Sequence, residues 1–397
     1  MLESVLAGMR VVDLTQNVAG PFCTQILGDL GAEVIKVERP GRGDDTRDWR
    51  PPDFNGQSAT FLALNRNKKS VCVDLASPGG RQLVCDLAAS SDVLIHSMKP
   101  GSAEKLGLGF NDLKAASPRL VYCSISAFGQ TGPLRSLPGY DPLMQAFTGI
   151  MSTTGHEGDD PVRVGVSLID MGTGMWAALA ILAGLTQRGR TGEGLQVETS
   201  LLETGITWMS IFVAGFLATG MVPRKLGSAM AMTAPYELFR CADRHVFIAA
   251  GNDGLFARVC SGLGCGGLAT DPRFSSNSAR VLNRADLHAE IESVTEPMQA
   301  ADVVAALRAA GAPCSELHDV SQLLEHEQVR ATGLISPLPL DGIPHHRVIG
   351  LPIKAGGKRS AAMAPPPPLG HDTDAILASI GYDEDRIVGL RRAGAIG

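Results

Sequence analysis

The chain has 397 residues, a formal net charge of −6 and an apolar share of 44%. This length predicts two domains, and the ordinary apolar share excludes a disordered chain. Basic and acidic residues are interleaved, which argues against a nucleic-acid partner because such proteins cluster Lys and Arg. The longest apolar stretch, 208–222, is interrupted by two glycines and is too short to span a bilayer, so we expect a core helix there and no membrane partner.

The first segments of the chain predict a βαβ unit. Residues 9–14 (MRVVDL) and 32–38 (AEVIKVE) have the apolar pattern of strands, and residues 17–30 between them have that of a helix. Pro21 suits the first turn of this helix and Gly31 suits its end. We therefore expect a strand, a helix and a second strand in this order.

The same alternation continues along the chain. Residues 70–75, 92–97 and 120–126 are further strand candidates, and the stretch after Pro78 predicts a helix. Strands that alternate with helices indicate a mostly parallel sheet with helices on its faces. The expected fold class is therefore α/β, with a Rossmann-like large domain.

A further unit is predicted around Asp170. Residues 163–170 (RVGVSLID) have the pattern of a strand, residues 171–174 (MGTG) that of a tight connection, and residues 175–189 that of a helix apolar nearly all round. Asp170 would then stand between a strand and a helix.

A composition shift near 217–232 marks a second domain. Residues 235–252 resemble a hairpin that leads into a helical region, so we place a smaller α+β domain at 225–330. Residues 1–224 and 331–397 would form the large domain.

The C-terminal part of the chain should contain a connector and a helix. Residues 355–370 are rich in Gly and Pro and predict an extended connector. A final amphipathic helix is expected from near Asp372.

Cysteine usage and the N-terminal pattern indicate a cytoplasmic protein. The eight cysteines are scattered in apolar contexts, and the start MLESVLAGMRVVDL lacks the basic-then-apolar plan of a signal peptide. Cys260 and Cys265 have no second pair at zinc spacing, and the histidines show no HExxH pattern. We expect no metal site.

The turn after the first strand is a candidate anion site. Its sequence, TQNVAGP over 15–21, has no GxGxxG, so NAD binding is not expected. The backbone N–H groups of a helix start can still receive a phosphate. Arg39 opens a cationic loop at the end of the second predicted strand, where a Rossmann-like protein recognises ribose or its phosphate. The alternative is a solvated loop charge.

Asp170 allows two interpretations from local sequence. Asp is a common residue at the N-cap of a helix, and that role is favoured locally. Alternatively, Asp170 is a carboxylate nucleophile, because the small residues Gly172 and Gly174 would let a bulky thioester approach. Backbone N–H groups at the helix start would stabilise an oxyanion.

Motifs in unbroken order along the chain carry a family resemblance. They include VVDLTQNVAGPFCTQILGDLGAEVIKVERPGRGDDTR, LNRNKKSVCVDL, KPGSAEKLGLGF, LVYCSISAFGQTGPLRSLPGYD, GVSLIDMGTG and RTGEGLQVETSLLE. Over essentially its whole length the sequence resembles the family III CoA-transferases, which include formyl-CoA transferase, carnitine CoA-transferase and the α-methylacyl-CoA racemases. The resemblance implies coenzyme A and acyl-CoA as substrates, no tightly bound cofactor, and an interlocked homodimer.

The resemblance also implies roles for single residues. The family's nucleophile falls on Asp170. Its CoA-lining positions fall on Asn17, Val18, Ala19, Arg39, Val73, Ser97, Met98 and Lys105. Four of these depart from the formyl-CoA transferase pattern, in which Ser97-Met98 is Asn-Phe, Lys105 is Arg and Val18 is Gln. These differences argue against oxalate and formate as substrates.

Tyr140 separates two branches of the family. The racemases need His in a Gly-His-Asp motif, where this chain has Gly139-Tyr140-Asp141. A phenol with a pKa of about 10 is a poor base at neutral pH, which favours a transferase. Tyr140 is expected to orient a substrate carboxylate through its hydroxyl; the alternative is a half-buried aromatic residue.

The expected reaction moves CoA from a donor such as succinyl-CoA to a small organic acid. Residues 249–254 (AAGNDG) resemble the GND segment of family members that use dicarboxylates. Arg47, Arg224 and Lys225 are candidates to bind a second carboxylate, with surface or structural ion pairs as the alternative. A racemase and a non-catalytic acyl-CoA-binding protein remain as other functions.

Overall fold

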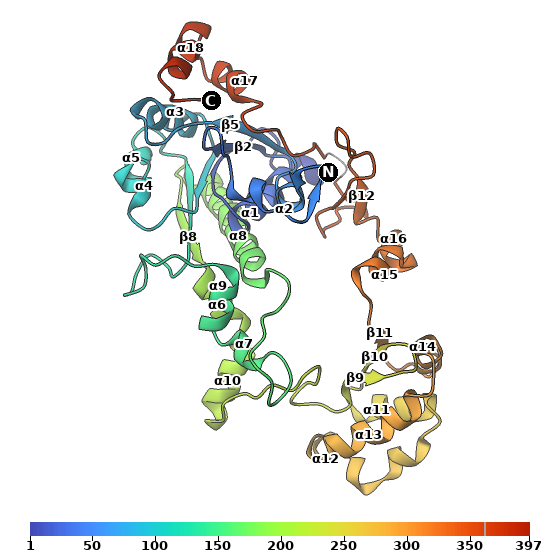
Figure 1. Ribbon diagram of the computed structural model, residues 1–397. Helices are drawn as coiled ribbons and strands as arrows, with labels where there is room; N and C mark the ends of the chain where they lie inside the picture. The colour runs from blue at the N-terminus through green and yellow to red at the C-terminus, as the bar shows by residue number, and fades with distance from the viewer. Residues whose placement is uncertain (361–362) are drawn as a thin grey trace. The chain divides into compact units, whose positions relative to one another are not determined.

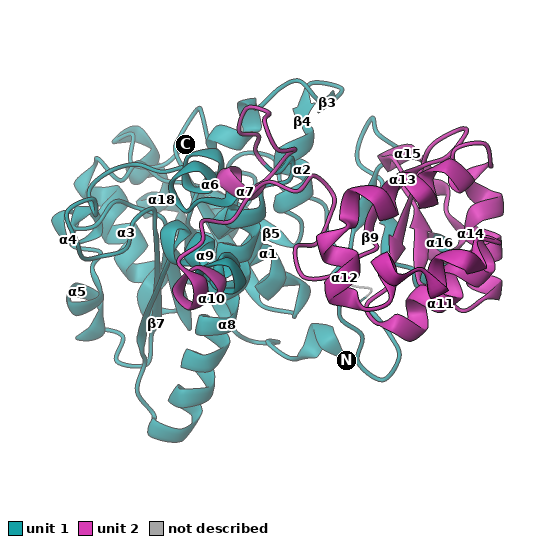
Figure 2. Ribbon diagram, turned by 90° about the horizontal axis from the view of Figure 1, so that it is seen from below, with its two compact units in different colours: residues 1–150, 164–214, 330–397 teal, residues 151–163, 215–329 magenta. Residues whose placement is uncertain are grey.

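A computed structural model describes residues 1–360 and 363–397, which form two compact units (Figures 1 and 2). The first unit comprises residues 1–150, 164–214 and 330–397, and the second comprises residues 151–163 and 215–329. The second unit therefore includes residues 151–163 and 215–224, which lie outside the range 225–330 predicted for the small domain.

A six-stranded parallel sheet forms the centre of the first unit. Its strand order is β5-β2-β1-β6-β7-β8. The strands are β1 (Arg10–Leu14), β2 (Glu33–Glu38), β5 (Lys68–Cys72), β6 (Val93–His96), β7 (Val121–Ser126) and β8 (Gln196–Ser200). Counted along the chain, this is the 3-2-1-4-5-6 order of a doubly wound sheet, which binds ligands where the order reverses beside its first strand. The predicted α/β class is confirmed.

Helices cover both faces of this sheet because each strand buries both of its sides. Along β1, Val11 packs into one apolar core and Val12 into the other. The helices whose residues contribute to the first core include α1 (Ala19–Asp29), α6 (Asp141–Phe147), α8 (Leu168–Thr191) and α9 (Leu201–Trp208). Those on the second include α3 (Pro78–Ala89), α5 (Phe110–Lys114), α17 (Thr373–Ser379) and α18 (Glu384–Arg392).

The smaller elements of the first unit lie mostly in its loops. They are the helices α2 (Ala59–Leu64) and α4 (Ser102–Lys105), the hairpin of β3 (Asp53–Phe54) and β4 (Gln57–Ser58), and the pair β12 (Ile335–Pro337) and β13 (Arg347–Ile349). Three short or bent helices fall at the unit boundaries: α7 (Ile150–Thr153), α10 (Ser210–Thr219) and α16 (Glu327–Thr332).

The start of α8 corrects the prediction for 163–174. No strand forms over 163–170, and the helix begins at Leu168, so the MGTG segment lies inside it. The valines of this segment pair with no strand, although β8 is left as an edge of the sheet. Val166 is accordingly exposed. Asp170 lies in the first turn of α8, and Ser167 takes the N-cap position.

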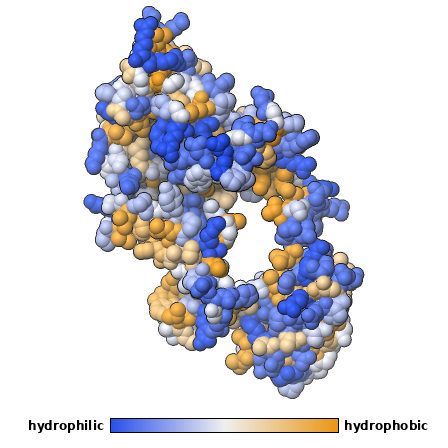
Figure 3. All heavy atoms as spheres, viewed as in Figure 1, coloured by the Kyte–Doolittle hydropathy of each residue, from blue (hydrophilic) through white to orange (hydrophobic). Residues whose placement is uncertain are grey.

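The apolar stretch 208–222 is not a core helix, contrary to expectation. The chain bends by 59° between α9 and α10, and α10 buries no residue. Apolar side chains gather over α10 in Figure 3, with Ile211 69% and Leu217 77% exposed. By length and composition α8 could cross a membrane, as could α9 and α10 taken as one bent span. Nevertheless, α8 packs against α1, β7 and β8 as the core helix of a globular unit does.

The second unit contains the expected hairpin. Strands β9 (Tyr236–Arg240) and β10 (His245–Ala249) are antiparallel, and β11 (Cys314–Glu316) pairs with β10 on its other side. Its remaining helices are α11 (Asp253–Gly262), α12 (Asn277–Leu282), α13 (Arg284–Thr295), α14 (Ala300–Ala309) and α15 (Val320–Glu325). Sheet and helices enclose a separate apolar core that includes Phe239, Val259 and Leu307.

The C-terminal segment follows the predicted plan in its described part. The connector predicted over 355–370 includes residues 361 and 362, which lie outside the described residues; 355–360 and 363–370 contain neither helix nor strand. Asp372 is the N-cap residue of α17, so the expected helix is confirmed. The second helix α18 was not predicted.

Candidate active site

Two adjoining pockets open at the carboxyl ends of the parallel strands. The first has a volume of about 470 Å³ and is lined by residues that follow β1, β2, β5 and β6. The second has a volume of about 280 Å³ and is lined from the start of α1, the ends of β6 and β7, and Asp170. Both include Gln16, Asn17, Ser97 and Met98 in their walls, so they are two parts of one cleft. The cleft lies beside β1, where a doubly wound sheet is expected to bind its ligand.

The loop between β1 and α1 forms the wall that both pockets share. Asn17 has a φ of 67°, a left-handed conformation that Asn tolerates better than most residues. Gly20 lies so close to Thr15 that a Cβ atom on it would come within 2.2 Å of the Thr15 Cβ. The short turn therefore depends on Asn at one position and Gly at another.

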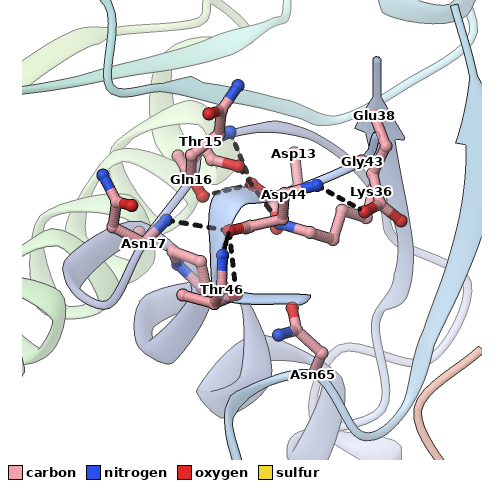
Figure 4. Close-up of polar contacts among 12 residues, drawn as sticks. Asp13, Thr15, Gln16, Asn17, Lys36, Glu38, Gly43, Asp44, Thr46 and Asn65 are labelled. Atoms are coloured by element: carbon pink, nitrogen blue, oxygen red, sulfur yellow. Dashed lines mark hydrogen bonds and ion pairs between the residues drawn. The ribbon is translucent and has the colours of Figure 1, made fainter. Parts of the chain in front are cut away.

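Asp44 supports this loop from below (Figure 4). Its Oδ1 accepts hydrogen bonds from the backbone N of Asn17 at 3.2 Å and of Thr46 at 2.9 Å. Its Oδ2 pairs with Nζ of Lys36 at 2.7 Å, and both side chains are fully buried. Lys36 Nζ also donates to the carbonyl of Thr15 at 3.1 Å. The ion pair thus holds both ends of the Thr15–Asn17 turn.

The buried acids Asp13 and Asp44 below the β1–α1 loop, called the floor acids here, are stabilised by neighbouring positive charges and hydrogen-bond donors. Burial would raise the pKa of Asp44, but Lys36 and the hydrogen bonds from Thr46 bring that pKa below its ordinary value. The same holds for the buried Asp13, whose pKa is raised by burial but lowered overall by Lys68, Lys36 and two threonine hydroxyls. The acids of the floor are therefore ionised and fixed in place.

The cleft contains most of the residues predicted to bind CoA. Residues in one or both pockets are Asn17, Val18, Ala19, Arg39, Val73, Ser97 and Met98. Arg39 is held at the rim by Asp45 and by the side chain of Gln16, with Nη2 to Oε1 at 3.2 Å. Lys105, in contrast, is exposed at the end of α4 and lines neither pocket.

Asp170 lies in the second pocket and differs from the floor acids. No residue in the ranges 1–360 and 363–397 donates a hydrogen bond to its carboxylate. Burial, followed by the negative charge of Asp141, raises the pKa of Asp170 to about 7. Its carboxylate therefore lines the pocket without a hydrogen-bond donor from the described residues.

Gly172 and Gly174 serve helix packing rather than ligand access, contrary to the expectation for these small residues. A Cβ atom on Gly174 would come within 2.5 Å of the carbonyl oxygen of Ala19, and one on Gly172 within 2.7 Å of the Trp208 ring. These glycines let α1 and α9 approach α8. They bring Asp170 close to the β1–α1 loop.

Two further side chains line the Asp170 pocket. Tyr140 is 58% exposed, so it is not the half-buried aromatic residue of the alternative interpretation. Lys99 follows β6 and is the one cation among the described residues that line this pocket. The sequence interpretation missed Lys99, although it lies two residues after a predicted strand, in the loop region where parallel sheets bind ligands.

The basic residues proposed for a second carboxylate are already engaged. Arg47 donates to Glu38 through Nε at 2.8 Å and Nη2 at 2.6 Å, and its guanidinium lies 3.8 Å from the centre of the Phe61 ring. In the second unit, Arg224 lies 3.5 Å from Glu157, and Lys225 donates to the carbonyl of Asp159. The structural alternative therefore holds for Arg47.

The GND segment of the second unit also has a structural role. The side chain of Asn252 accepts from the backbone N of Leu255 and caps α11. Asp253 pairs with the buried Arg280 at 2.7 Å. Among the described residues, no group of three His, Cys, Asp or Glu side chains is arranged to hold a metal ion.

Two acids in the site carried a sequence signal that was not used. Asp141 closes the Gly-Tyr-Asp motif and Asp44 lies in the segment after Arg39. Lys36 gave the clearest hint, because a lysine inside an otherwise apolar strand needs a buried acid as partner.

Comparison with known proteins gives a family. The model of the family described as CoA-transferase family III matches residues 6–373. A succinyl-CoA:glutarate CoA-transferase of Mus musculus is 38% identical over 98% of this chain and 90% of its own length. A succinate–glutarate CoA-transferase of Agrobacterium fabrum is 37% identical over 83% of this chain and 84% of its own. The crystal structure of a CAIB/BAIF family protein from Brucella suis superposes with a TM-score of 0.84 at 38% identity, covering 94% of this chain and 99% of that one.

Proposed function

Because the chain belongs to CoA-transferase family III, we propose that it moves CoA between small carboxylic acids through covalent intermediates on Asp170. The observation that carries this proposal is the Asp170 carboxylate, which faces the second pocket without a hydrogen-bond donor from the described residues. A nucleophile that must attack a substrate cannot be held by protein donors as Asp44 is. The cleft next to it offers the β1–α1 loop and Arg39 for the nucleotide end of CoA.

The proposed reaction proceeds in four exchanges, at the carbonyls of the donor, of Asp170 and of the acceptor. An oxygen of Asp170 attacks the thioester carbon of the donor, the C–S bond breaks, and CoA leaves as a thiolate, which gives a mixed anhydride. The thiolate attacks the aspartyl carbonyl and releases the donor acid, leaving an aspartyl-CoA thioester. The acceptor carboxylate attacks that thioester and expels the CoA thiolate, forming a second anhydride. The thiolate then attacks the acceptor's carbonyl, which yields the new acyl-CoA and restores Asp170.

The start of α8 suits this chemistry electrostatically. Asp170 lies in the first turn, where the helix dipole acts against the repulsion that the Asp141 carboxylate exerts on negative charge. The pKa of about 7 leaves a large ionised fraction at neutral pH and keeps the carboxylate more basic than an ordinary one. Its more basic oxygen is therefore a stronger nucleophile.

We propose dicarboxylic acids as the acyl groups, with succinyl-CoA as donor. The support is that relatives such as the mouse and Agrobacterium enzymes are named for succinyl or succinate and glutarate. Lys99 supplies a positive charge beside the phosphates and carboxylates that such substrates bring into the pocket. Tyr140 offers a hydroxyl at the rim. No histidine lines this pocket within the described chain, so nothing in it favours racemase chemistry.

Trapping the intermediate tests the proposal. After incubation with succinyl-CoA, borohydride should reduce the enzyme-bound thioester and hydroxylamine should form a hydroxamate, and peptide mass spectrometry should find both on Asp170. Asp170→Asn should lower kcat for succinyl-CoA with glutarate by more than about 1,000-fold. Asp385→Asn, a change of an exposed first-turn aspartate of α18, is the matched control and should keep full activity. Full turnover of Asp170→Asn would refute the proposal.

We also propose that the protein is a homodimer in which a second copy covers α10. The uncovered apolar side chains of Ile211, Phe216 and Leu217 support this proposal, because exposed apolar patches of this kind mark interfaces. Sedimentation equilibrium should give twice the chain mass. Leu217→Glu should shift the protein toward the monomer, whereas a wild-type monomer at micromolar concentration would contradict the proposal.

A further inference from the structure

The first turn of α8 is held by a carboxylate from another helix. Asp141 Oδ2 accepts hydrogen bonds from the backbone N of Ile169 at 2.7 Å and of Asp170 at 3.0 Å. Ser167, at the N-cap position, makes no side-chain cap hydrogen bond. Asp141 is the first residue of α6 and is only 2% exposed. It therefore does for α8 what a capping residue of the same helix ordinarily does.

Gln145 fixes the direction of Asp141. Lying one turn later on α6 and fully buried, it donates from Nε2 to Asp141 Oδ1 at 2.5 Å. Its Oε1 accepts from the backbone N of Val164 at 2.8 Å, so it also ties down the segment that leads into α8. Both carboxylate oxygens of Asp141 thus have donors, and neither can turn away without losing one.

This arrangement leaves the side chain of Asp170 free. An aspartate in a first turn ordinarily competes for the unpaired N–H groups of the helix start. Here the N–H groups of residues 169 and 170 are already bound to Asp141, so the Asp170 carboxylate is left facing the pocket. The same contact places a negative charge beside it.

Within the described part of the chain, few other charged groups lie around Asp170. Lys99 comes from the loop after β6, and the phenol of Tyr140 comes from the segment before α6. On α9, Glu203 is turned to the hydroxyl of Ser200 at 2.6 Å. The residues of α1 that line the pocket, Ala19 and Gly20, carry no charge. Asp141 is therefore the acid placed to act on Asp170.

We propose that Asp141, locked by Gln145, is a positioning residue that caps the helix start in place of Asp170 and keeps Asp170 a free, basic nucleophile. The inference rests on the proposed role of Asp170 and names what sets its reactivity. In the Gly139-Tyr140-Asp141 segment, Asp141 would then position Asp170, whereas Tyr140 would contact the substrate.

Exchanging the two side chains isolates the charge. In Asp141→Asn alone, the new amide N–H group would face the Gln145 amide donor. In the double variant Asp141→Asn/Gln145→Glu, the carboxylate of residue 145 accepts from residue 141 and from the Val164 N–H, while the side-chain oxygen of residue 141 still caps α8. The net charge and these hydrogen bonds are kept, the longer bond from Gln145 Nε2 to the Val164 carbonyl at 3.4 Å is lost, and the negative charge moves one helix turn along α6.

The pH profile of kcat/KM for succinyl-CoA with glutarate is the readout. The wild-type enzyme should lose activity below about pH 7 as Asp170 is protonated. The double variant should shift this acid limb downward by at least about half a pH unit, because the repelling charge is farther away. Asp141→Asn alone should also shift the limb downward and lower kcat about 10- to 100-fold, since the helix start is less well held.

Thr173→Val is the matched control. Thr173 is buried in the same part of α8, where its hydroxyl donates to the carbonyl of Ile169 at 2.8 Å and also hydrogen-bonds Thr204. Its loss loosens the helix without changing charge, so the acid limb should stay in place. If the acid limb of the pH profile is unchanged in both Asp141 variants while their Asp170 is still labelled by hydroxylamine, the inference is wrong but the proposed function stands. Absence of label on wild-type Asp170 would instead overturn the proposed function. If the double variant fails to fold, the limb of Asp141→Asn decides.

Discussion

Buried acids occur in two regions of the cleft, below the β1–α1 loop and at the first turn of α8, and their surroundings differ. Under the loop, Asp44 accepts from Lys36, Asn17 and Thr46, and its pKa lies below the ordinary range. At α8, the neighbour of Asp170 is another acid, and burial with that charge raises its pKa to about 7. The donors around Asp44 hold it rigidly and make it a poor nucleophile. The surroundings of Asp170 destabilise its ionised form and leave its carboxylate free to react.

The difference explains why the two regions adjoin. Asp170 can act only if the substrate carbonyl is held in a fixed place, and the loop that holds CoA is itself held by the Lys36–Asp44 pair. Stabilising ion pairs on one side of the cleft thus support a destabilised group on the other.

The largest effect should come from breaking the Lys36–Asp44 pair. Asp44→Ala leaves the buried Lys36 ammonium without its acid and frees the N–H groups of Asn17 and Thr46. We expect a loss of about 3 to 5 kcal/mol in the free energy of unfolding, measured by urea denaturation at pH 7.

The adjacent acid provides the control for this change. Asp45 pairs with Arg39 at the surface, where the side chain of Asp45 is 35% exposed and that of Arg39 is 45% exposed. Asp45→Ala should cost less than about 1 kcal/mol. Equal losses in the two variants would mean that the buried pair does not stabilise the loop.

A smaller loss should follow from a methyl group between α8 and α1. Gly174→Ala forces the backbone at Ala19 to move, because the new Cβ atom would lie 2.5 Å from its carbonyl oxygen. We expect a loss of about 1 to 3 kcal/mol and a weaker affinity for CoA, measured by thermal unfolding and calorimetric titration.

Gly189 gives a matched position on the same helix. A Cβ atom there meets nothing within 4 Å, so Gly189→Ala should stabilise the protein by about 0.5 to 1 kcal/mol through helix propensity. A stabilising Gly174→Ala would show that α1 and α8 are not in close contact.

The sequence predicted the central strands well because they are buried on both sides. Runs such as VVDL and VLIH have no polar face, and the structure places both in the middle of the sheet. The helix at 175–189 was predicted because its sequence is apolar nearly all round, although Met175 and Leu179 are exposed in the structure. Its true start at Leu168 was missed, because the residue that caps it lies 29 positions before Asp170, on α6.

The site was predictable to the extent that it follows the chain locally. Asn17, Val18 and Ala19 lie in the turn and helix start that follow β1, and Ser97 and Met98 lie directly after β6, so knowing the strands gives these positions. Contacts that the folded chain creates were not predictable. The ion pair of Arg47 with Glu38 forms because the loop after β2 turns back onto that strand. The exposure of α10 could not be predicted either, because an apolar stretch does not reveal whether another part of the chain covers it.

The smallest expected effect is the dependence of the free energy of unfolding on pH that Asp170 causes. A carboxyl whose pKa is about 7 when folded and about 3.9 when unfolded binds its proton more tightly in the folded state. Folding is therefore disfavoured as the pH rises from about 4 to about 7, and the full cost is present above pH 7.

Asp170→Asn removes this cost while keeping the shape of the side chain. We expect the variant to be more stable than the wild type by about 1 to 2 kcal/mol at pH 8.5, a value discounted because Asp170 is partly exposed, and by clearly less at pH 5. Urea denaturation at the two pH values measures the difference, with Asp385→Asn as the exposed first-turn control. A gain that is the same at both values would arise from packing and not from charge. A gain confined to high pH would mean that the ionised carboxylate, which we propose as the nucleophile, weakens the fold.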